Sequence, residues 1–304
     1  MTDIVAAIAP IFCLIILGTV LRTLNFPGEA FWPLSARLVY FLLLPALLVN
    51  TLAPADLTNA AVLPLGFSAL IAVLVIALGL VLLKGIVHLE GRAFTSIFQG
   101  AIRHNSYIGL AGAASLFGTS GLALMAILFA FVIPIVNVLC VSALSYYTAE
   151  TTVSWPRIIK SIVKNPLIIG CLIGITLNMT GLGLPLGSGE VLGLLSRAAL
   201  PLGLLIVGAD LNMALMTRST GAIIFSSGLK LVLYPLIVAL ACGWLGVTGE
   251  SYVIAVLFAA LPTSTSAYIL AVELGGDEKL MAAIITGQTL IAGLTMPLML
   301  AWLV

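Results

Sequence analysis

Long runs of apolar residues, separated by short polar turns, make up almost the whole chain. A helix needs about 20 apolar residues to cross the hydrocarbon core of a bilayer, at about 1.5 Å per residue. By that criterion the pattern predicts ten membrane spans, at residues 4–24, 34–53, 61–83, 93–117, 121–147, 163–180, 192–212, 220–246, 251–273 and 279–303. The sequence therefore predicts an all-α integral membrane protein.

Composition supports this interpretation and narrows the possible partners. Of the 304 residues, 62% are hydrophobic and only 8% are charged, more apolar surface than a water-soluble domain can bury. The formal net charge of +1, without a basic cluster, gives no reason to expect a nucleic-acid partner. The four cysteines lie in apolar runs without a CxxC pair or a histidine at ligand spacing. We therefore expect neither a metal site nor a cofactor.

The positions of the basic residues predict how the chain is oriented in the membrane. The connections after the odd-numbered spans contain Arg22, Lys84, Arg92, Arg157, Lys160, Lys164, Arg218 and Lys279. The connections after the even-numbered spans contain the acidic Asp56, Glu190 and Glu250, but no lysine or arginine. Because Lys and Arg favour the cytoplasmic side, we expect a multi-pass protein of the cell (inner) membrane with both termini extracytoplasmic.

An internal repeat divides the chain into two halves. Pro10 in "PIFCLIILGTVL" matches Pro166 in "PLIIGCLIGITL", and "LPALLVNTLA" matches "LPLGLLIVGA" at the same offset of 156 residues. The halves are residues 1–147 and 163–304, joined by a cytoplasmic linker at 148–162. Each half holds five spans, an odd number, so the second half enters the membrane from the opposite face. Such an inverted repeat is typical of secondary transporters, whose substrate site lies near the midplane between broken helices.

Two polar stretches mark where helices are expected to break. "AIRHNSYIGL" interrupts the fourth span, and "AALPTSTSAYIL" interrupts the ninth, where Pro262 also removes a backbone donor. Asn105, Ser106 and the threonines are N-cap residue types, so each new half-helix would direct its positive end at the midplane. An arginine beside those ends favours an anion. The predicted substrate-binding residues are Arg103, His104, Asn105, Ser106, Pro262, Thr263, Ser264, Thr265 and Ser266, with Asn50 and Gln288 from neighbouring spans.

Several of these residues also have a structural interpretation. Thr265 and Ser266 could bond back to the preceding turn, and Arg103 could hold two helices together through a salt bridge. His104 could couple transport to protons, or it could be a neutral hydrogen-bonded histidine. Asn50 and Gln288 could line the cavity or form hydrogen bonds between helices.

Four other polar residues of the spans have weaker interpretations. For Arg37, Asp210 and Lys230, near the predicted inner ends of their spans, we expect snorkelling or pairing in a loop. Arg197 lies nearer the outer end of the seventh span, and the sequence gives it no role.

Three stretches carry a resemblance to a known family. "HNSYIG" at His104, "ALPTSTSAYILAVELG" at Ala260 and "LPLGLLIVGADL" resemble the auxin efflux carrier family, which includes plant PIN-type exporters and bacterial carriers of malonate and other organic acids. By match, Asn105 resembles the family's crossover asparagine and Ser106 its hydroxyl neighbour, whereas His104 stands where the plant members have proline. The resemblance implies an elevator, related to the bile-acid-transporter architecture. Spans 1, 2, 6 and 7 would form a scaffold, often homodimeric, and spans 3–5 and 8–10 a moving transport domain.

These observations together predict a secondary transporter rather than an enzyme. The expected substrate is a small organic anion, a carboxylate such as malonate, another short organic acid or an auxin-like acid, with proton or Na⁺ coupling open. The alternative is a sodium-coupled carrier of a larger organic anion, of the bile-acid-transporter type. An intramembrane hydrolase is disfavoured, because Ser106 and His104 are nearly adjacent in sequence, with no oxyanion-type glycine motif beside them.

Overall fold

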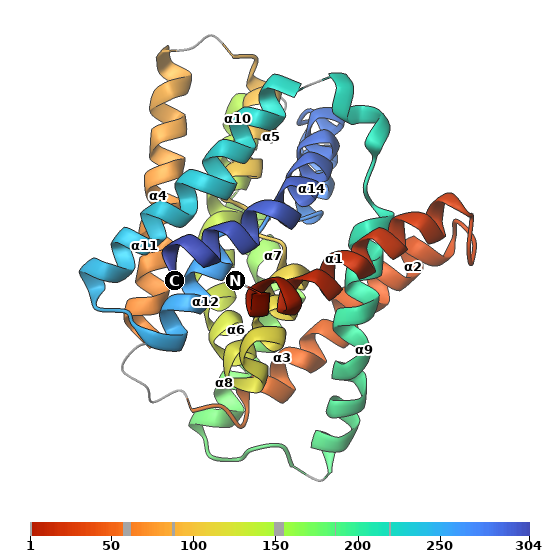
Figure 1. Cartoon of the computed structure of the whole chain (residues 1–304), viewed down its shortest axis with the longest axis vertical. Helices are drawn as coiled ribbons and strands as arrows, with labels where there is room; N and C mark the ends of the chain where they lie inside the picture. Colours follow the sequence, from red (N-terminus) through yellow and green to blue (C-terminus); the bar gives the residue numbers. More distant parts are fainter. Residues whose placement is uncertain (1, 57–61, 87–88, 149–154, 186, 219) are drawn as a thin grey trace.

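In the computed structural model, residues 2–56, 62–86, 89–148, 155–185, 187–218 and 220–304 are described, and they form helices joined by short turns (Figure 1). The first part of the chain contains α1 (Thr2–Thr23), α2 (Phe31–Leu38), the π-helical turn η1 (Val39–Leu43), α3 (Leu44–Leu52), α4 (Val62–Ile86), α5 (Gly91–Ile102) and α6 (Ser106–Tyr147). The second part contains α7 (Trp155–Val163), α8 (Pro166–Met179), α9 (Ser188–Ala209), the 3-10 turn η2 (Met213–Arg218), α10 (Thr220–Gly228), the π-helical turn η3 (Leu229–Leu233), α11 (Tyr234–Leu245), α12 (Gly249–Ala259), α13 (Ser266–Glu273) and α14 (Glu278–Leu303). The predicted linker 148–162 lies partly outside the described residues.

The helices have the length and composition of membrane spans. Within the described ranges, seven helical segments are long and apolar enough to cross a membrane, and α8 and α12 are shorter apolar helices. One of the seven, Gly91–Tyr147, has 57 residues, which as a straight helix would measure about 85 Å. It contains a break after Ile102 and a sharp bend at Gly118, where φ is 59° and ψ is −133°. An all-α integral membrane protein is confirmed, and the count of ten spans stays a prediction.

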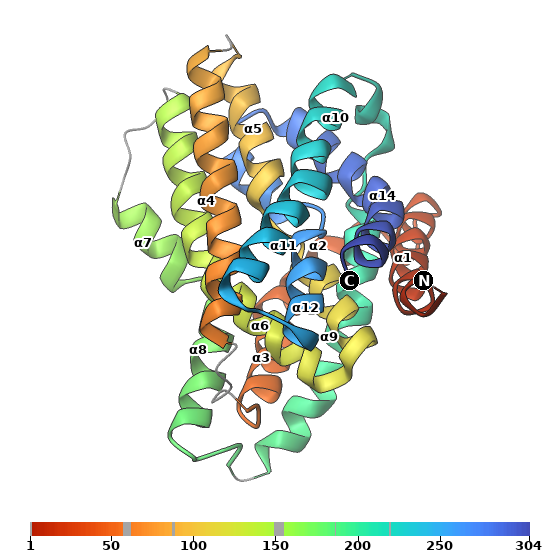
Figure 2. The same cartoon turned by 60° about the vertical axis from the view of Figure 1, so that its left-hand side comes forward.

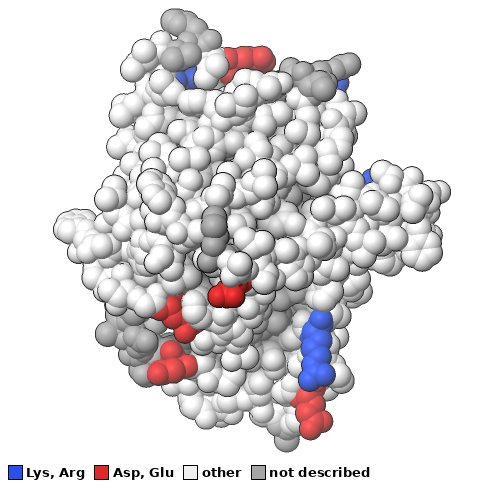
Figure 3. Space-filling model, viewed as in Figure 1, with Lys and Arg blue, Asp and Glu red and all other residues white. Residues whose placement is uncertain are grey.

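The surface suits contact with lipid. Most of the face in Figure 3 carries no charged side chain. Large apolar side chains are exposed on α1, α4, α8 and α11, among them Ile16, Leu78, Leu172 and Leu240. Exposed apolar surface on this scale would be unstable in water but is the expected covering of a helix in hydrocarbon.

Two groups of helices pack most closely among themselves. In the first, α1 lies along α9, and α3 lies along α8 and α9. In the second, α4 packs on α6 and α11, and α14 packs on α5 and α10. Figure 1 shows α1 and α2 reaching out beside α9, and Figure 2 shows α4 and α5 on the side of the molecule opposite α1. The chain is thus divided into a part containing α1, α3, α8 and α9 and a part containing the interrupted helices.

Glycines explain how closely α1 and α9 approach. A Cβ at Gly18 would overlap the backbone of Leu205, and one at Gly208 would overlap the backbone of Ile15. The hydroxyl of Thr19 donates to the carbonyl of Gly208 at 2.8 Å. Small residues at such crossings let two helix backbones pack in the absence of a hydrophobic driving force.

Two prolines widen the helices that contain them. Pro45 and Pro235 each stand in the first turn after a π-helical turn, η1 and η3. Proline has no N–H and its ring clashes with the carbonyl four residues earlier, here in Phe41 and Leu231, so the preceding turn opens. The turn η3 carries Lys230, the one lysine that the structure describes inside the segment Thr220–Leu245.

Candidate functional site

The two predicted helix breaks are present and touch each other. Residues 103–105 separate α5 from α6, and residues 260–265 separate α12 from α13. The backbone N–H of Asn105 donates to the carbonyl of Pro262 at 2.9 Å. Unwound backbone is tolerated at membrane depth only where protein or water satisfies it, and here each break supplies a partner for the other.

The start of α6 is capped as the sequence predicts. The side-chain oxygen of Asn105 accepts hydrogen bonds from the N–H groups of Tyr107 and Ile108, at 3.1 and 3.2 Å. Because Asn105 is buried and its amide oxygen is occupied, its contribution to a ligand would come through the amide nitrogen or through the helix end that it fixes.

The start of α13 is held by a hydroxyl pair. The Ser264 hydroxyl accepts from the Ser266 N–H at 3.3 Å and lies 2.9 Å from the Ser266 hydroxyl. Thr265 occupies the N-cap position but forms no side-chain cap bond. Two of the four consecutive hydroxyl residues therefore work together, and Thr263 faces elsewhere, with its hydroxyl 3.4 Å from the carbonyl of Gln99.

Arg103 joins the two breaks and carries a charge with no described counter-ion. One terminal nitrogen of its guanidinium donates to Ser266 at 3.0 Å, and the other donates to the side-chain oxygen of Asn137 in α6 at 3.1 Å. Arg103 is 8% exposed, and its Nε has no hydrogen-bond partner among the described residues. No ion pair within 4 Å among the described residues includes Arg103, so the structure does not place it in a salt bridge. Both of these hydrogen-bond partners are neutral.

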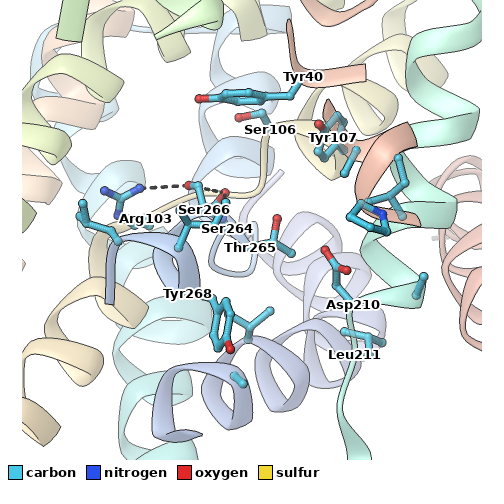
Figure 4. A pocket seen from close by; sticks show the side chains of 18 of the residues that line it. Tyr40, Arg103, Ser106, Tyr107, Asp210, Leu211, Ser264, Thr265, Ser266 and Tyr268 are labelled. Carbon is cyan, nitrogen blue, oxygen red and sulfur yellow. Dashed lines mark hydrogen bonds between the residues drawn. The ribbon is translucent and has the colours of Figure 1, made fainter. Parts of the chain in front are cut away.

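A cavity of about 1420 Å³ opens beside Arg103. Of the predicted site residues, its lining includes Arg103, His104, Ser106, Ser264, Thr265 and Ser266, together with Tyr40, Tyr107, Asn137 and Tyr268. Figure 4 shows the guanidinium of Arg103 bonded to Ser266, with Thr265 and Asp210 farther along the same cavity. Asn50, Asn105, Pro262, Thr263 and Gln288 are not among the lining residues.

Gln288 braces both breaks from behind the cavity. Its side-chain oxygen accepts from the Thr263 N–H at 3.0 Å, and its nitrogen donates to the carbonyl of Gly100 at 3.1 Å and to the Ser226 hydroxyl at 3.0 Å. The side chain is fully buried. Gln288 therefore has the interhelical role that the sequence left open.

Sequence reasoning missed Asn137 and misjudged Lys230. Asn137 is a single polar residue in an apolar run, three residues after Pro134, and that isolation was its only signal. The prediction that Lys230 snorkels or pairs in a loop is wrong, because its side chain is fully buried with Nζ 4.1 Å from the ring centroid of Tyr234. Pro235, which follows η3, was the sequence signal for an irregular helical turn at Lys230.

An ionic cluster of Arg22, Glu29 and Asp210 lines another part of the cavity. Arg22 donates through one terminal nitrogen to the carbonyl of Ala209 at 3.0 Å and through the other to Glu29 at 3.2 Å. The nitrogen that contacts Ala209 also lies 3.6 Å from a carboxylate oxygen of Asp210. The expected loop pairing of Asp210 is thus confirmed. Burial raises the pKa of Asp210 from 3.8 to about 6, and the positive charge of Arg22 limits the rise.

Asp210 should therefore make stability depend on pH. A carboxyl group with a raised pKa in the folded state contributes its full stability below about pH 4 and loses it as pH rises through about 6. We expect the unfolding temperature of Asp210→Asn, relative to that of the natural protein, to be higher at pH 8 than at pH 4.5, because the variant has no charge to bury. The side chain is 40% exposed to the cavity, which keeps the effect modest.

Thermal unfolding in detergent from pH 4.5 to 8 measures this difference. Glu190→Gln, an exposed change at the start of α9, is the control and should follow the natural protein at every pH. Parallel curves for Asp210→Asn and the natural protein would contradict the assignment.

Comparisons with known proteins agree on one class. The family model described as "Membrane transport protein" matches residues 3–300. An "Uncharacterized transporter" of Methanothermobacter thermautotrophicus is 28% identical over 312 residues, covering 95% of this chain and 94% of the relative. A "Putative malonate transporter" of Rhizobium meliloti is 27% identical over 312 residues, covering 96% and 93%.

Proposed function

Because the chain belongs to the membrane transport protein family, we propose that it is a secondary transporter that moves a short carboxylate across the membrane by alternating access. The observation that carries the substrate class is Arg103, a buried guanidinium on the wall of a large cavity with no described carboxylate paired to it. A charge without a counter-ion inside a membrane protein marks a substrate or ion pathway.

The anion site combines a charge with two helix ends. A carboxylate near Arg103 would accept charge-assisted hydrogen bonds from the guanidinium, which bind more strongly than neutral ones. The N-termini of α6 and α13 meet at the same place and add their positive dipole ends. The hydroxyls of Ser106, Ser264 and Thr265 also line the cavity and complete the coordination.

Malonate is the substrate that we propose to test first. One relative is named a putative malonate transporter, and malonate carries two carboxylates that match a cavity with a guanidinium and several hydroxyls. The alternative, a sodium-coupled carrier, has less support, because Ser266 already accepts a hydrogen bond from the cation of Arg103. A hydroxyl next to a fixed positive charge is a poor ligand for Na⁺.

An elevator movement agrees with the way the helices pack. The proposed scaffold of spans 1, 2, 6 and 7 corresponds to α1, α2 with α3, α8 and α9, which pack mainly on one another. The two breaks, Arg103 and Gln288 all belong to the other group of helices. An inverted repeat at an offset of 156 residues supports the same division. Pairing of two copies through the scaffold stays a prediction.

The residues that line the cavity support a proposal for which side is open in this conformation. Its lining includes Arg22, Arg37 and Lys279, which belong to the connections or span ends that the positive-inside rule places in the cytoplasm. We infer that the structure represents a cytoplasm-facing state, with both chain termini on the outer side.

A ligand screen tests the proposal. We expect malonate to raise the thermal unfolding temperature of the purified protein more than acetate or indole-3-acetate does, because ligands that bind the folded state stabilise it. Measurements with Na⁺ and with choline as the cation distinguish the sodium-coupled alternative. Stabilisation by taurocholate that requires Na⁺, with no response to malonate, would contradict the proposal.

A further inference from the structure

Lys230 is a buried amine in the middle of an apolar helical segment. Its side chain is fully buried, and its Nζ has no hydrogen-bond partner among the described residues. The amine lies over the ring of Tyr234, with 4.1 Å between Nζ and the ring centroid. No ion pair of the described residues includes Lys230.

No described carboxylate lies within 4 Å of the Lys230 amine. The turn η3 is packed against α5, α10, α11 and α14. Of these, α10 has no charged residue, α11 contributes Tyr234, and the charged Arg92, Glu278 and Lys279 stand in the first turns of α5 and α14. Buried atoms without a partner nearby in the chain include the hydroxyl of Ser227, one turn before the lysine. The charged side chains of the helices packed on η3 thus stand at helix ends, and none of them forms an ion pair with the amine.

A short path connects this amine to the anion site. The ring of His104 lies 5.0 Å from the ring of Tyr234 and stacks on Phe258 at 4.1 Å, measured between centroids. His104 lines the cavity and is the neighbour of Arg103 in sequence. One histidine and one tyrosine ring therefore separate the Lys230 amine from the place where a carboxylate would bind.

The energetics make the charge of Lys230 depend on that anion. An ammonium group buried without a counter-ion costs several kcal/mol, and a desolvated cation–π contact recovers only about 2 kcal/mol. An anion in the cavity would supply the missing attraction, since charges interact strongly across a low-dielectric interior. Anion binding and protonation of the amine should therefore favour each other.

We propose that Lys230 is a proton-binding site, so that the transporter carries one proton together with each anion. As the anion binds at Arg103, a hydronium ion in the cavity gives its proton to the imidazole of His104, which lines the cavity, and the imidazole passes a proton on to the lone pair of Nζ, leaving water behind. When the anion leaves, the ammonium returns the proton to water by the same route. The inference rests on the proposed function, because it requires an anion at Arg103. Lys230 and Arg103 belong to the same group of helices, so both charges would move with the substrate.

The experiment uses the full chain in liposomes, with radiolabelled malonate and the membrane potential held at zero. The medium is at pH 7 and the interior at pH 8. With one proton carried per anion, one pH unit should raise the steady-state accumulation ratio of malonate about tenfold.

Three variants test whether Lys230 is the proton site. Lys230→Met should bind malonate and transport it without the tenfold rise, and Lys230→Arg should also lack the rise because the charge of arginine is fixed. Lys84→Met, at the end of α4, is the matched control and should keep the tenfold response.

A second measurement separates coupling from folding. Calorimetry in buffers of different ionisation enthalpy should show proton uptake when the natural protein binds malonate and none for Lys230→Met. The unfolding temperature of Lys230→Met should be no lower than that of the natural protein, since the variant removes an unpaired buried amine. A gradient response preserved in Lys230→Met, or absent from a natural protein that binds malonate, would overturn the coupling alone. Absence of any malonate binding or uptake would overturn the proposed function as well.

Discussion

Replacing Arg103 with alanine should weaken malonate binding by roughly 30-fold or more, because truncating a buried charge that contacts its ligand costs about 2 kcal/mol or more. The guanidinium is held by Ser266 and Asn137, so it is already oriented toward the cavity before the ligand arrives. Isothermal titration with malonate measures the loss. Folding should be retained, because the variant removes a charge that has no described counter-ion.

Two control variants separate the charge from its surroundings. Ser266→Ala removes one hydroxyl and should cost a few-fold at most, about 0.5–1.5 kcal/mol for a single hydrogen bond. Arg197→Ala removes an exposed arginine of α9 that does not line the cavity and should leave affinity unchanged. Equal losses for Arg103→Ala and Ser266→Ala would argue that the hydroxyls, and not the charge, dominate binding.

The features that were predictable from the sequence have local causes. Helix ends are encoded by residues that stand at the end itself, such as Asn105 as a cap and Pro262 as a breaker. The span positions follow from run length and hydropathy, and α1 and α14, for example, begin and end within two residues of the predicted 4–24 and 279–303. The residue pattern alone is therefore enough to locate both interrupted helices.

The features that the sequence missed or left open depend on contacts between distant segments. Asn137 orients Arg103 across 34 residues of sequence, and Gln288 reaches residues 25, 62 and 188 positions away. A single polar residue in an apolar run gives the same local signal whether it braces a helix or lines a cavity. Lys230 was misjudged because depth in the membrane was read from sequence position, whereas the wide turn before Pro235 holds its side chain in the interior.

Gln288→Leu should destabilise the protein by about 3 kcal/mol or more, because each buried polar group left without a partner costs about 1–3 kcal/mol. The substitution removes three hydrogen bonds, to the Thr263 N–H, the Gly100 carbonyl and the Ser226 hydroxyl. These groups lie on the ninth-span break, on α5 just before Arg103, and on α10. Unfolding followed by circular dichroism in detergent measures the change.

Gln288→Leu should lose both stability and malonate affinity, unlike Arg103→Ala. Gln288 does not line the cavity, so any loss of malonate affinity in Gln288→Leu must arise from displacement of the two breaks that it ties together. We therefore expect stability and affinity to fall together, whereas Arg103→Ala loses affinity alone. Thr289→Val, one residue along α14, is the matched control, because Thr289 bonds only back to the carbonyl of Ile285 in its own helix. If Gln288→Leu unfolded at the same temperature as Thr289→Val, the crossing of the breaks would not need this brace, and the Asn105–Pro262 backbone contact would have to hold them by itself.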